Sequence, residues 1–338
     1  MKQVWIPKIG DPEVLEVREA EDPVPGPGEV RVRVEASGVN FADILARMGL
    51  YPDAPKLPAV VGYEVAGIVD EAGEGVVGLA NGDRVVAMTR FGGYSDVVCV
   101  PRGLIQAQPA NLGAEEAASI PVNYLTAWLM LVRLGNVRAG ERVLVHACAG
   151  GVGLAAVQIC RHFGAEVIGT ASAGKHERLR EMGVGECIDY RTQDFEEAVA
   201  DLTDGRGVDI ALDAVGGESF SKSYRCLDSL GRLFVFGVSG MAPGSKRRLG
   251  AALLGLLRMP KFKPLSLMTF NRGVFGVNVG HLWHRGDVLA AMLGEILDLF
   301  ADGTFKPVVD RVFPFAEAAA AHQYIQDRKN FGKVVLTP

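Results

Sequence analysis

The stretch RVLVHACAGGVGLAAVQICR, residues 142–161, decides the fold of this chain. It opens with an apolar, β-branched run from Val143 to Ala147 and passes through a glycine turn, C-A-G-G-V-G, between Cys148 and Gly153. Apolar residues at helical spacing follow the turn. Strand, glycine turn and helix in this order are typical of a unit that binds a dinucleotide, with the pyrophosphate at the helix N-terminus.

Each residue of the turn has a physical role in this interpretation. Gly150, Gly151 and Val152 bring backbone N–H groups close to a pyrophosphate, and Gly153 lets the helix lie close to the strand. The first glycine of the usual pattern is replaced by Cys148, which we interpret as a tolerated small side chain within reach of thiol reagents. A tight strand–helix turn without a ligand fits the same residues. Features elsewhere in the chain are therefore needed to distinguish a nucleotide site from a structural turn.

Composition sets the class of protein. The chain has 338 residues, 49% of them hydrophobic, and a net charge of −5, which gives it no electrostatic reason to bind nucleic acid. Its five cysteines are scattered without C-x-x-C pairs, as in a reducing compartment. We find no signal-peptide core and no apolar run of the ~18 residues that a membrane span needs. We therefore expect a cytoplasmic protein of two domains.

Residues 1–122 read mostly as β-structure. The segment VRVRVEA alternates strictly between apolar and polar residues, so one of its faces should be buried. Four strand regions follow from this kind of pattern and from the turn signals between them: 30–36, 60–69, 82–86 and 92–98. Short strands at this spacing predict a compact, barrel-like β domain.

The pattern changes near Pro121, where strands begin to alternate with helices. We predict helices over 174–183, 194–204 and 286–302, and strands over 142–147, 166–171, 186–190, 208–213, 231–237 and 273–279. This alternation is typical of a doubly wound parallel sheet, a Rossmann domain, whose last strand is 273–279. The strand-like tail at 334–336 should return to the first domain.

The segment 241–270 is basic around the apolar core LGAALLGLL. We interpret it as an amphipathic helix packed on the fold. A lid over a substrate site and a helix on a membrane surface are the two alternatives.

The residues after the second strand of the sheet indicate which nucleotide binds. A fold that prefers NAD places a carboxylate there, about 20 residues after the glycines, whereas this chain has Ser172 followed by Lys175. A hydroxyl and a cation favour the 2′-phosphate of NADPH. Tyr190 could cover the phosphoribose, and Gly237 completes the predicted nucleotide site at the end of the fifth strand.

Several motifs together give the chain a family likeness. It resembles the medium-chain dehydrogenase/reductase superfamily, within it the zinc-free quinone oxidoreductases, and among these the VAT-1-like branch. The resemblance rests on PVPGPGEVRVRV (23–34), VVGYEVAGIV (60–69), NGDRVVAM (81–88), GGYSDVV (92–98), VNYLTAW (122–128), HACAGGVG (146–153), GTASAGKHE (169–177) and RKNFGKVVL (328–336).

The resemblance implies a reaction without zinc. Zinc members carry a cysteine ligand in the segment that matches 38–43 and a histidine ligand where this chain has Tyr63, so we expect no metal. Alcohol oxidation then lacks the metal ion that would hold the alcohol as an alkoxide. Hydride transfer to an electron-poor quinone or α,β-unsaturated carbonyl needs only positioning and hydrogen bonds.

The resemblance also implies site residues. Asn40 and Tyr51 match residues beside the nicotinamide and the substrate, and we predict that they are catalytic. Tyr63 and Asn123 are assigned to the substrate, and Thr126 to the cofactor.

Arg328 and Asn330 match a C-terminal motif that closes over the cofactor. Leu45 departs from the pattern, because some bacterial quinone reductases have a second tyrosine there. Because of this departure, enoyl compounds remain an alternative class of substrate.

The expected protein has a GroES-like domain formed by 1–122 and 284–338 and a Rossmann domain formed by 123–283. It reduces a quinone or another activated carbonyl compound with NADPH in a cleft between the domains. The alternatives are a 2-enoyl thioester reductase and an NADPH-binding, membrane-associated adaptor with weak catalysis. The partner is a small electron-poor substrate, and the last strand of the sheet suggests a homodimer. Membrane contact through 241–270 is possible but not favoured.

Overall fold

The computed structural model describes residues 1–242, 244, 250, 255 and 257–338. The chain divides into two compact units, each formed by more than one segment. The first comprises Met1–Leu125, Gly244–Arg247 and Val279–Pro338, and the second comprises Thr126–Pro243 and Arg248–Asn278.

The first unit is a β domain that the C-terminal segment completes. Its strands are β1 (Lys2–Trp5), β2 (Glu16–Glu19), β3 (Glu29–Val39), β4 (Glu64–Ala72), β5 (Arg84–Met88), β6 (Val97–Pro101), β7 (Ile105–Ala107), β14 (Val309–Pro314) and β15 (Lys333–Thr337). Its α-helices are α1 (Phe41–Arg47), α2 (Ala114–Ala117), α10 (Gly286–Ala301) and α11 (Ala318–Gln326). Short helical turns are η1 (Pro12–Val14), η2 (Arg102–Leu104), η6 (Val279–His281), η7 (Trp283–Arg285) and η8 (Phe315–Glu317).

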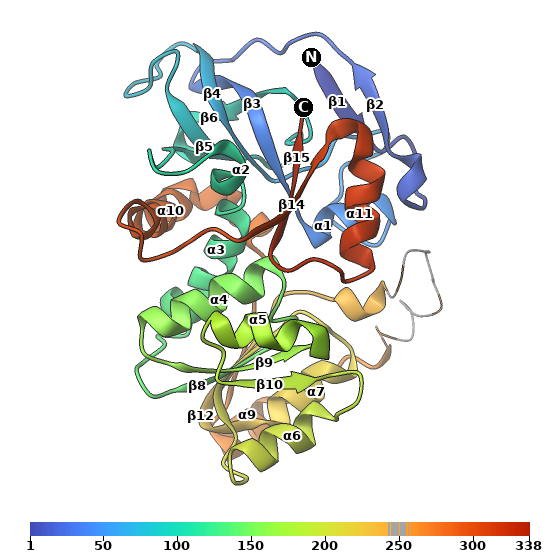
Figure 1. Ribbon diagram of the computed structural model, residues 1–338, viewed down its shortest axis with the longest axis vertical. Helices are drawn as coiled ribbons and strands as arrows, with labels where there is room; N and C mark the ends of the chain where they lie inside the picture. Colours follow the sequence, from blue (N-terminus) through green and yellow to red (C-terminus); the bar gives the residue numbers. More distant parts are fainter. Residues whose placement is uncertain (243, 245–249, 251–254, 256) are drawn as a thin grey trace. The chain divides into compact units, whose positions relative to one another are not determined.

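A seven-stranded sheet organises this unit around β3. The strand order is β14-β15-β3-β4-β5-β7, and β6 pairs with β3 as well. The last strand, β15, pairs antiparallel with β3, with Val334 opposite Val39. Figure 1 shows β15 beside β3. The first sixth of the chain and its final residues therefore share one sheet, and the tail returns to the first domain as predicted.

Two strands of the β domain are shorter than predicted. The region 60–69 becomes a strand only at Glu64, because Gly62 has a φ of +101° that breaks the extended run. Val60 and Val61 accept backbone hydrogen bonds from the loop at 92–94 instead. That loop is correspondingly not a strand, and β6 starts at Val97.

The second unit alternates strands and helices along the chain. Its strands are β8 (Arg142–Val145), β9 (Glu166–Ala171), β10 (Glu186–Asp189), β11 (Val208–Asp213), β12 (Leu227–Val235) and β13 (Gly273–Gly276). Its helices are α4 (Gly151–His162), α5 (His176–Glu181), α6 (Phe195–Leu202), α7 (Glu218–Arg225) and α9 (Pro264–Phe270), with short turns η4 (Ala173–Lys175) and η5 (Ser239–Met241). Helix α3 (Pro121–Trp128), followed by the π-helical η3 (Leu129–Leu134), carries the chain from the first unit into the second.

The six strands form a parallel sheet in the order β10-β9-β8-β11-β12-β13. This is the order of a Rossmann fold, in which ligands bind where the strand order reverses, here between β8 and β11. Figure 1 shows α4 and α5 on one side of β9 and β10 and α6 on the other. The predicted doubly wound sheet is confirmed.

Three details of this unit differ from the predictions. The strand expected over 273–279 ends at Gly276. The helix expected over 174–183 is a short 3₁₀ turn followed by α5. Most of the apolar core of 241–270 lies outside the described residues, whereas the end of this segment forms α9.

One helical run has the length and apolar character of a membrane span, although the sequence predicted no such run. It covers Ala114–Leu134, with a mean hydropathy of 1.2, among the residues that the structure describes. Since 78% of its apolar window is buried inside the protein, it has the character of a core helix.

Candidate active site

The glycine turn lies at the carboxyl end of β8, at the point where the strand order reverses. Helix α4 begins at Gly151 with Gly150 as N-cap, and no side chain caps it. Its first N–H groups have no acceptor within the helix, so they can bind an anion. The backbone N–H groups of His146 and Cys148 still donate to the neighbouring strands, and Ala147 between them has a strained φ of +50°.

The packing of Gly153 explains why this position tolerates no side chain. A Cβ atom there would lie 2.4 Å from the carbonyl oxygen of Cys148, a backbone contact that cannot move aside cheaply. Cys148 itself is fully buried, and burial raises the pKa of its thiol. The expectation that thiol reagents reach this cysteine is therefore wrong for the folded chain, because neither the thiol nor a thiolate is exposed.

The residues predicted to bind the ribose end surround the carboxyl ends of β9, β10 and β12. Ser172 follows β9 directly and is half-buried, and its carbonyl accepts the N–H of Lys175. Tyr190 follows β10, with the Arg191 guanidinium 6.0 Å from its ring centre. Gly237 follows β12 and lies against the loop after β11. The four predicted residues thus all lie at the edge where the parallel strands end.

A buried histidine joins three strand ends beneath the turn. His146 lies 3.2 Å from the Thr170 hydroxyl through Nδ1 and 3.0 Å from the Ser223 hydroxyl through Nε2. Burial lowers its pKa. Because Ser223 donates to Asp213, His146 must donate to Ser223 through Nε2 and accept from Thr170. His146 is therefore a core histidine with both ring nitrogens hydrogen-bonded.

Asp213, the last residue of β11, is not among the site residues predicted from the sequence. Its fully buried carboxylate accepts hydrogen bonds from the backbone N–H groups of Val215 (2.7 Å) and Gly216 (3.4 Å). The hydroxyls of Ser219 and Ser223 donate to it as well, both at 2.7 Å. These bonds fix the loop after β11, one side of the position where the strand order reverses. The second unit as a whole fits a dinucleotide: uncapped helix N–H groups, a close-packed glycine and rigid strand ends.

In the first unit, Asn40 lies at the centre of a buried polar cluster. Its Nδ2 donates to Glu64 Oε1 at 2.9 Å, and its Oδ1 accepts from Lys333 Nζ at 2.8 Å. Lys333 also pairs with Glu64 Oε1, and Glu64 Oε2 accepts the backbone N–H of Val122 at 2.7 Å. A Cβ atom on Gly38 would overlap both charged side chains, so glycine makes room for the pair.

The chemistry of these partners fixes the orientation of the Asn40 amide. Lysine can only donate, so the side facing Lys333 must be the oxygen, and the carboxylate of Glu64 can only accept, so the side facing it must be the nitrogen. The nitrogen is further occupied by a long bond of 3.4 Å to the Gly38 carbonyl. What Asn40 can still offer a ligand is the second lone pair of its oxygen.

Asp43 completes a capping box at the start of α1. Its carboxylate accepts from the N–H groups of Asn40 (2.8 Å) and Gly62 (3.0 Å) and from the Tyr94 hydroxyl (3.0 Å). The Tyr94 hydroxyl lies 3.2 Å from His322 Nε2. Asp43 is fully buried, and this burial raises its pKa from 3.8 to about 7 against the opposing effect of its hydrogen bonds.

Tyr51 and Tyr63 lie next to each other, and Phe91 extends the aromatic cluster. The ring centres of Tyr51 and Tyr63 are 6.5 Å apart in an edge-to-face arrangement, and the ring centres of Tyr63 and Phe91 are 5.4 Å apart. The Tyr63 hydroxyl is buried, and its pKa is raised by burial and by the nearby Asp43 and Tyr51. Tyr51 is only partly buried, so it is the better placed of the two to meet a ligand.

The remaining predicted residues lie in two places. Asn123 and Thr126 are on α3, where the Asn123 amide donates to a backbone carbonyl one turn earlier, at 3.0 Å. Arg328 and Asn330 lie between α11 and β15. Arg328 has a φ of +56°, a strained conformation for a residue with a side chain, and Asn330 donates to the Gly332 carbonyl at 2.9 Å.

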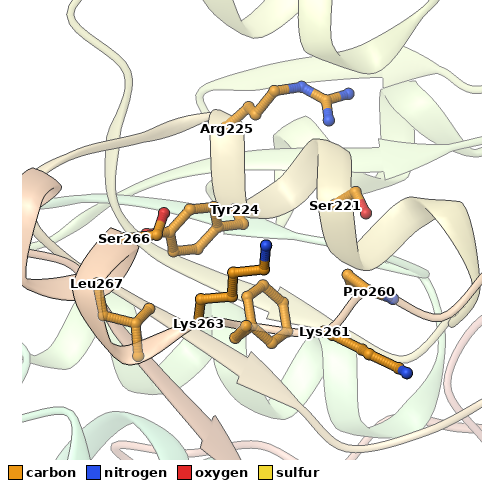
Figure 2. Close-up of a pocket in the computed structure, with 9 residues that line it drawn as sticks. Ser221, Tyr224, Arg225, Pro260, Lys261, Lys263, Ser266 and Leu267 are labelled. Carbon is orange, nitrogen blue, oxygen red and sulfur yellow. The ribbon is translucent and has the colours of Figure 1, made fainter.

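A hollow of about 240 Å³ lies elsewhere in the second unit, between α7 and the segment that leads into α9 (Figure 2). None of the predicted site residues lines it. Its lining residues are Ser221, Tyr224, Arg225, Pro260, Lys261, Phe262, Lys263, Ser266 and Leu267.

Metal ligands are not grouped in the part of the chain that the structure describes: it contains no cluster of three or more His, Cys, Asp or Glu side chains that could hold an ion. His281 and His284, three positions apart, lie in separate turns, and His281 pairs with Asp53 at 2.7 Å. Zinc independence stays a prediction.

The sequence contained signals for some of the residues that were missed. Asp43 follows Asn40 at the three-residue spacing of a capping box. Glu64 and Lys333 are single charges at the start of apolar strand segments, VAGIV and VVL. Nothing in the local pattern, however, pairs two residues that are 269 positions apart.

Comparison with known proteins agrees with this arrangement. Residues 26–126 match the family described as alcohol dehydrogenase GroES-like domain, and residues 182–336 match the family described as zinc-binding dehydrogenase. The chain is 41% identical to the synaptic vesicle membrane protein VAT-1 homolog of Rattus norvegicus, over 96% of this chain and 80% of that protein.

Solved structures that are similar over nearly the whole chain include a quinone oxidoreductase and an enoyl reductase. The quinone oxidoreductase of Escherichia coli complexed with NADPH has a TM-score of 0.88 and 31% identity, with 100% of both chains covered. CurK enoyl reductase has a TM-score of 0.86 and 29% identity, with 99% of this chain and 98% of that chain covered.

The two folds and the glycine turn define the class of protein: a two-domain oxidoreductase with a GroES-like and a Rossmann domain. The chain belongs to the medium-chain dehydrogenase/reductase superfamily and, within it, to the VAT-1-like branch.

The raised pKa of Asp43 predicts a pH dependence of stability. Between pH 3.8 and about 7 the folded state binds more protons at Asp43 than the unfolded state, so its contribution to stability is present at low pH and is lost as the pH rises through this window. Asp43→Asn removes the titrating carboxyl group. It also places an NH₂ group among the donors that face Asp43, at a cost in stability that does not depend on pH. We expect the difference in free energy of unfolding, wild type minus variant, to fall by up to about 1 kcal/mol per pH unit between pH 5 and 7.

Denaturant unfolding at several pH values measures this difference. Titrating groups outside the hydrogen-bond network of Asp43 are present in both proteins and cancel. Parallel curves for the two proteins over the whole range would show that Asp43 does not titrate there.

Proposed function

We propose that this protein transfers a hydride from NADPH to a quinone or another activated carbonyl compound without the help of a metal. The observation that carries the proposal is the uncapped N-terminus of α4 behind the close-packed Gly153, at the point of strand reversal. The similarity to a quinone oxidoreductase that was solved with NADPH supports it.

The residues of the second unit would hold the nucleotide. The N–H groups at Gly151, Val152 and Gly153 bind the pyrophosphate, and the dipole of α4 adds to this attraction. Ser172 and Lys175, at the end of β9, bind the 2′-phosphate by a hydroxyl donor and a positive charge. No carboxylate stands at Ser172 to repel it.

NADPH, when bound, supplies the hydride from C4 of its nicotinamide ring. In the first unit, the oxygen of Asn40 accepts a hydrogen bond from a reacting group, since its nitrogen is already occupied. The hydroxyl of Tyr51 donates a hydrogen bond to the substrate oxygen and stabilises the negative charge that develops there. The apolar surroundings of Tyr51, with Tyr63 and Phe91, strengthen this interaction because they exclude water.

The choice of nucleotide is tested by Lys175→Ala. A charge-assisted hydrogen bond to phosphate contributes about 1.5–3 kcal/mol, so the affinity for NADPH should fall by about 10- to 100-fold and that for NADH by much less. Fluorescence titration with each nucleotide measures both constants. Lys261→Ala, an exposed lysine of the same unit outside the predicted site, is the control. An equal loss for both nucleotides would refute the role of Lys175.

The substrate class is tested by the decay of NADPH absorbance with quinones, enones and enoyl-CoA thioesters. We expect faster turnover of the quinone or enone. Tyr51→Phe should lower kcat by about 100-fold, in the range of lost proton-transfer or oxyanion contacts. Tyr324→Phe is the matched control, since it removes a hydroxyl that donates to Asp310 at 2.9 Å outside the predicted site.

Faster turnover of the thioester would favour the enoyl reductase instead. The similarity to CurK enoyl reductase keeps this alternative open.

A second candidate function, membrane association with weak catalysis, is favoured by one surface. Leu265, Met268 and Phe270 of α9 are 75%, 71% and 52% exposed, and Lys261 and Lys263 precede them. An apolar face beside lysines suits the surface of an anionic membrane. The rat relative is also named a synaptic vesicle membrane protein.

Sedimentation with phosphatidylserine vesicles tests this candidate. Leu265→Ser combined with Met268→Ser should abolish binding, whereas Val77→Ser, at a residue 78% exposed in the first unit, should not.

Light scattering on the same proteins reports the homodimer that we also propose. A loss of mass without a change in vesicle binding would assign the α9 face to a second copy of the chain.

A further inference from the structure

The ion pair between Lys333 and Glu64 joins distant parts of the chain in the interior of the first unit. Lys333 is the first residue of β15 and Glu64 the first residue of β4, and their side chains are only 3% and 0% exposed. The ammonium group has two acceptors, Glu64 Oε1 and Asn40 Oδ1. It therefore contacts the predicted catalytic amide directly.

Stability alone is a weak explanation for such a pair. Two charges lose their hydration on burial, and an apolar pair of similar size often gives a fold of equal or greater stability. What an apolar pair cannot supply is direction. A methionine in place of Lys333 would fill the volume, but it would leave the oxygen of Asn40 without its donor.

The orientation of the amide matters because its oxygen and its NH₂ group have nearly the same shape, but the oxygen accepts hydrogen bonds and the NH₂ group donates them. Lys333 selects the orientation in which oxygen faces the ammonium and nitrogen faces Glu64. The backbone of Asn40 is held separately, by Asp43 in the capping box. The side chain alone therefore depends on Lys333 and Glu64.

We propose that Lys333 is a positioning residue of the reductase: it fixes the Asn40 amide with its oxygen available to a reacting group. This inference rests on the proposed function, in which Asn40 meets the reacting groups. Glu64 is the second half of the device. Its carboxylate accepts a hydrogen bond from the Asn40 amide nitrogen and balances the charge of Lys333.

The experiment compares two doubly substituted proteins that have lost both buried charges. Lys333→Met with Glu64→Gln has no donor to Asn40, whereas Lys333→Gln with Glu64→Gln keeps an N–H donor. Melting temperature reports the fold, and kcat and KM are measured separately with NADPH and the best substrate. Lys8→Met, at an exposed lysine of the first unit, is the control.

We expect both double variants to melt near the wild-type temperature. The methionine variant should lose at least about 10-fold in kcat with little change in KM, because a misplaced catalytic group acts on the transition state. The glutamine variant should recover part of this loss. In an Asn40→Ala background, the methionine and glutamine substitutions should have no further effect.

Equal and wild-type kcat values in both folded double variants would overturn the inference and leave Lys333 a structural residue. Should the double variants unfold, Lys333→Arg keeps the charge but moves the donor nitrogens. It should retain the melting temperature and lose kcat, and an unchanged kcat would again overturn the inference.

A crystal structure of the methionine double variant separates this inference from the proposed function. The inference expects the Asn40 amide to rotate away from its wild-type position, whichever substrate the enzyme uses. An unrotated amide refutes it. If the wild-type protein reduces neither quinones, enones nor enoyl thioesters, the proposed function fails, and the position of the amide still decides the role of Lys333.

Discussion

The first unit depends on one carboxylate. Glu64 accepts hydrogen bonds from the start of α3, from the turn before α1 and from the first residue of β15, so it joins three segments that are far apart in the sequence. The Glu64 carboxylate itself is fully buried, and its bonds are buried or partly buried, where each is electrostatically stronger and each missing partner more costly than in water. The consequence is that the predicted catalytic residue Asn40 has a single orientation, set by groups that contact no substrate in the proposed reaction.

In the second unit, a buried carboxylate likewise joins segments that are distant in the sequence. Beneath the glycine turn, His146 and Asp213 hold the ends of β8, β9 and β11 together through hydroxyl groups. Asp213 also fixes the loop that follows its own strand. Because the donors around Asp213 satisfy its charge and His146 stays neutral, the strand ends are rigid without adding a free charge beside the position proposed for the phosphates.

The local patterns of the sequence were sufficient for the order of the elements. Alternation of strands and helices after Pro121 predicts the parallel sheet, because both periodicities are properties of neighbouring residues. The errors lie at element ends. Gly62 breaks the predicted strand 60–69 because a positive φ does not fit an extended run, and the backbone of Val60 and Val61 pairs with a distant loop. The residue type of Cys148 predicts an accessible thiol, but only the packed structure shows that it is buried.

By itself, the sequence determined the class of fold and the glycine turn, since these follow from residue types and spacings along the chain, whereas Asn40 and Tyr51 were predicted from the family resemblance. The tertiary structure decided what Asn40 can do. Its amide orientation is set by Lys333, which is 293 positions away, and by Glu64, and no local pattern encodes a contact across that distance. The pKa of Asp43 has the same origin, because it is raised by burial that only the assembled β domain provides.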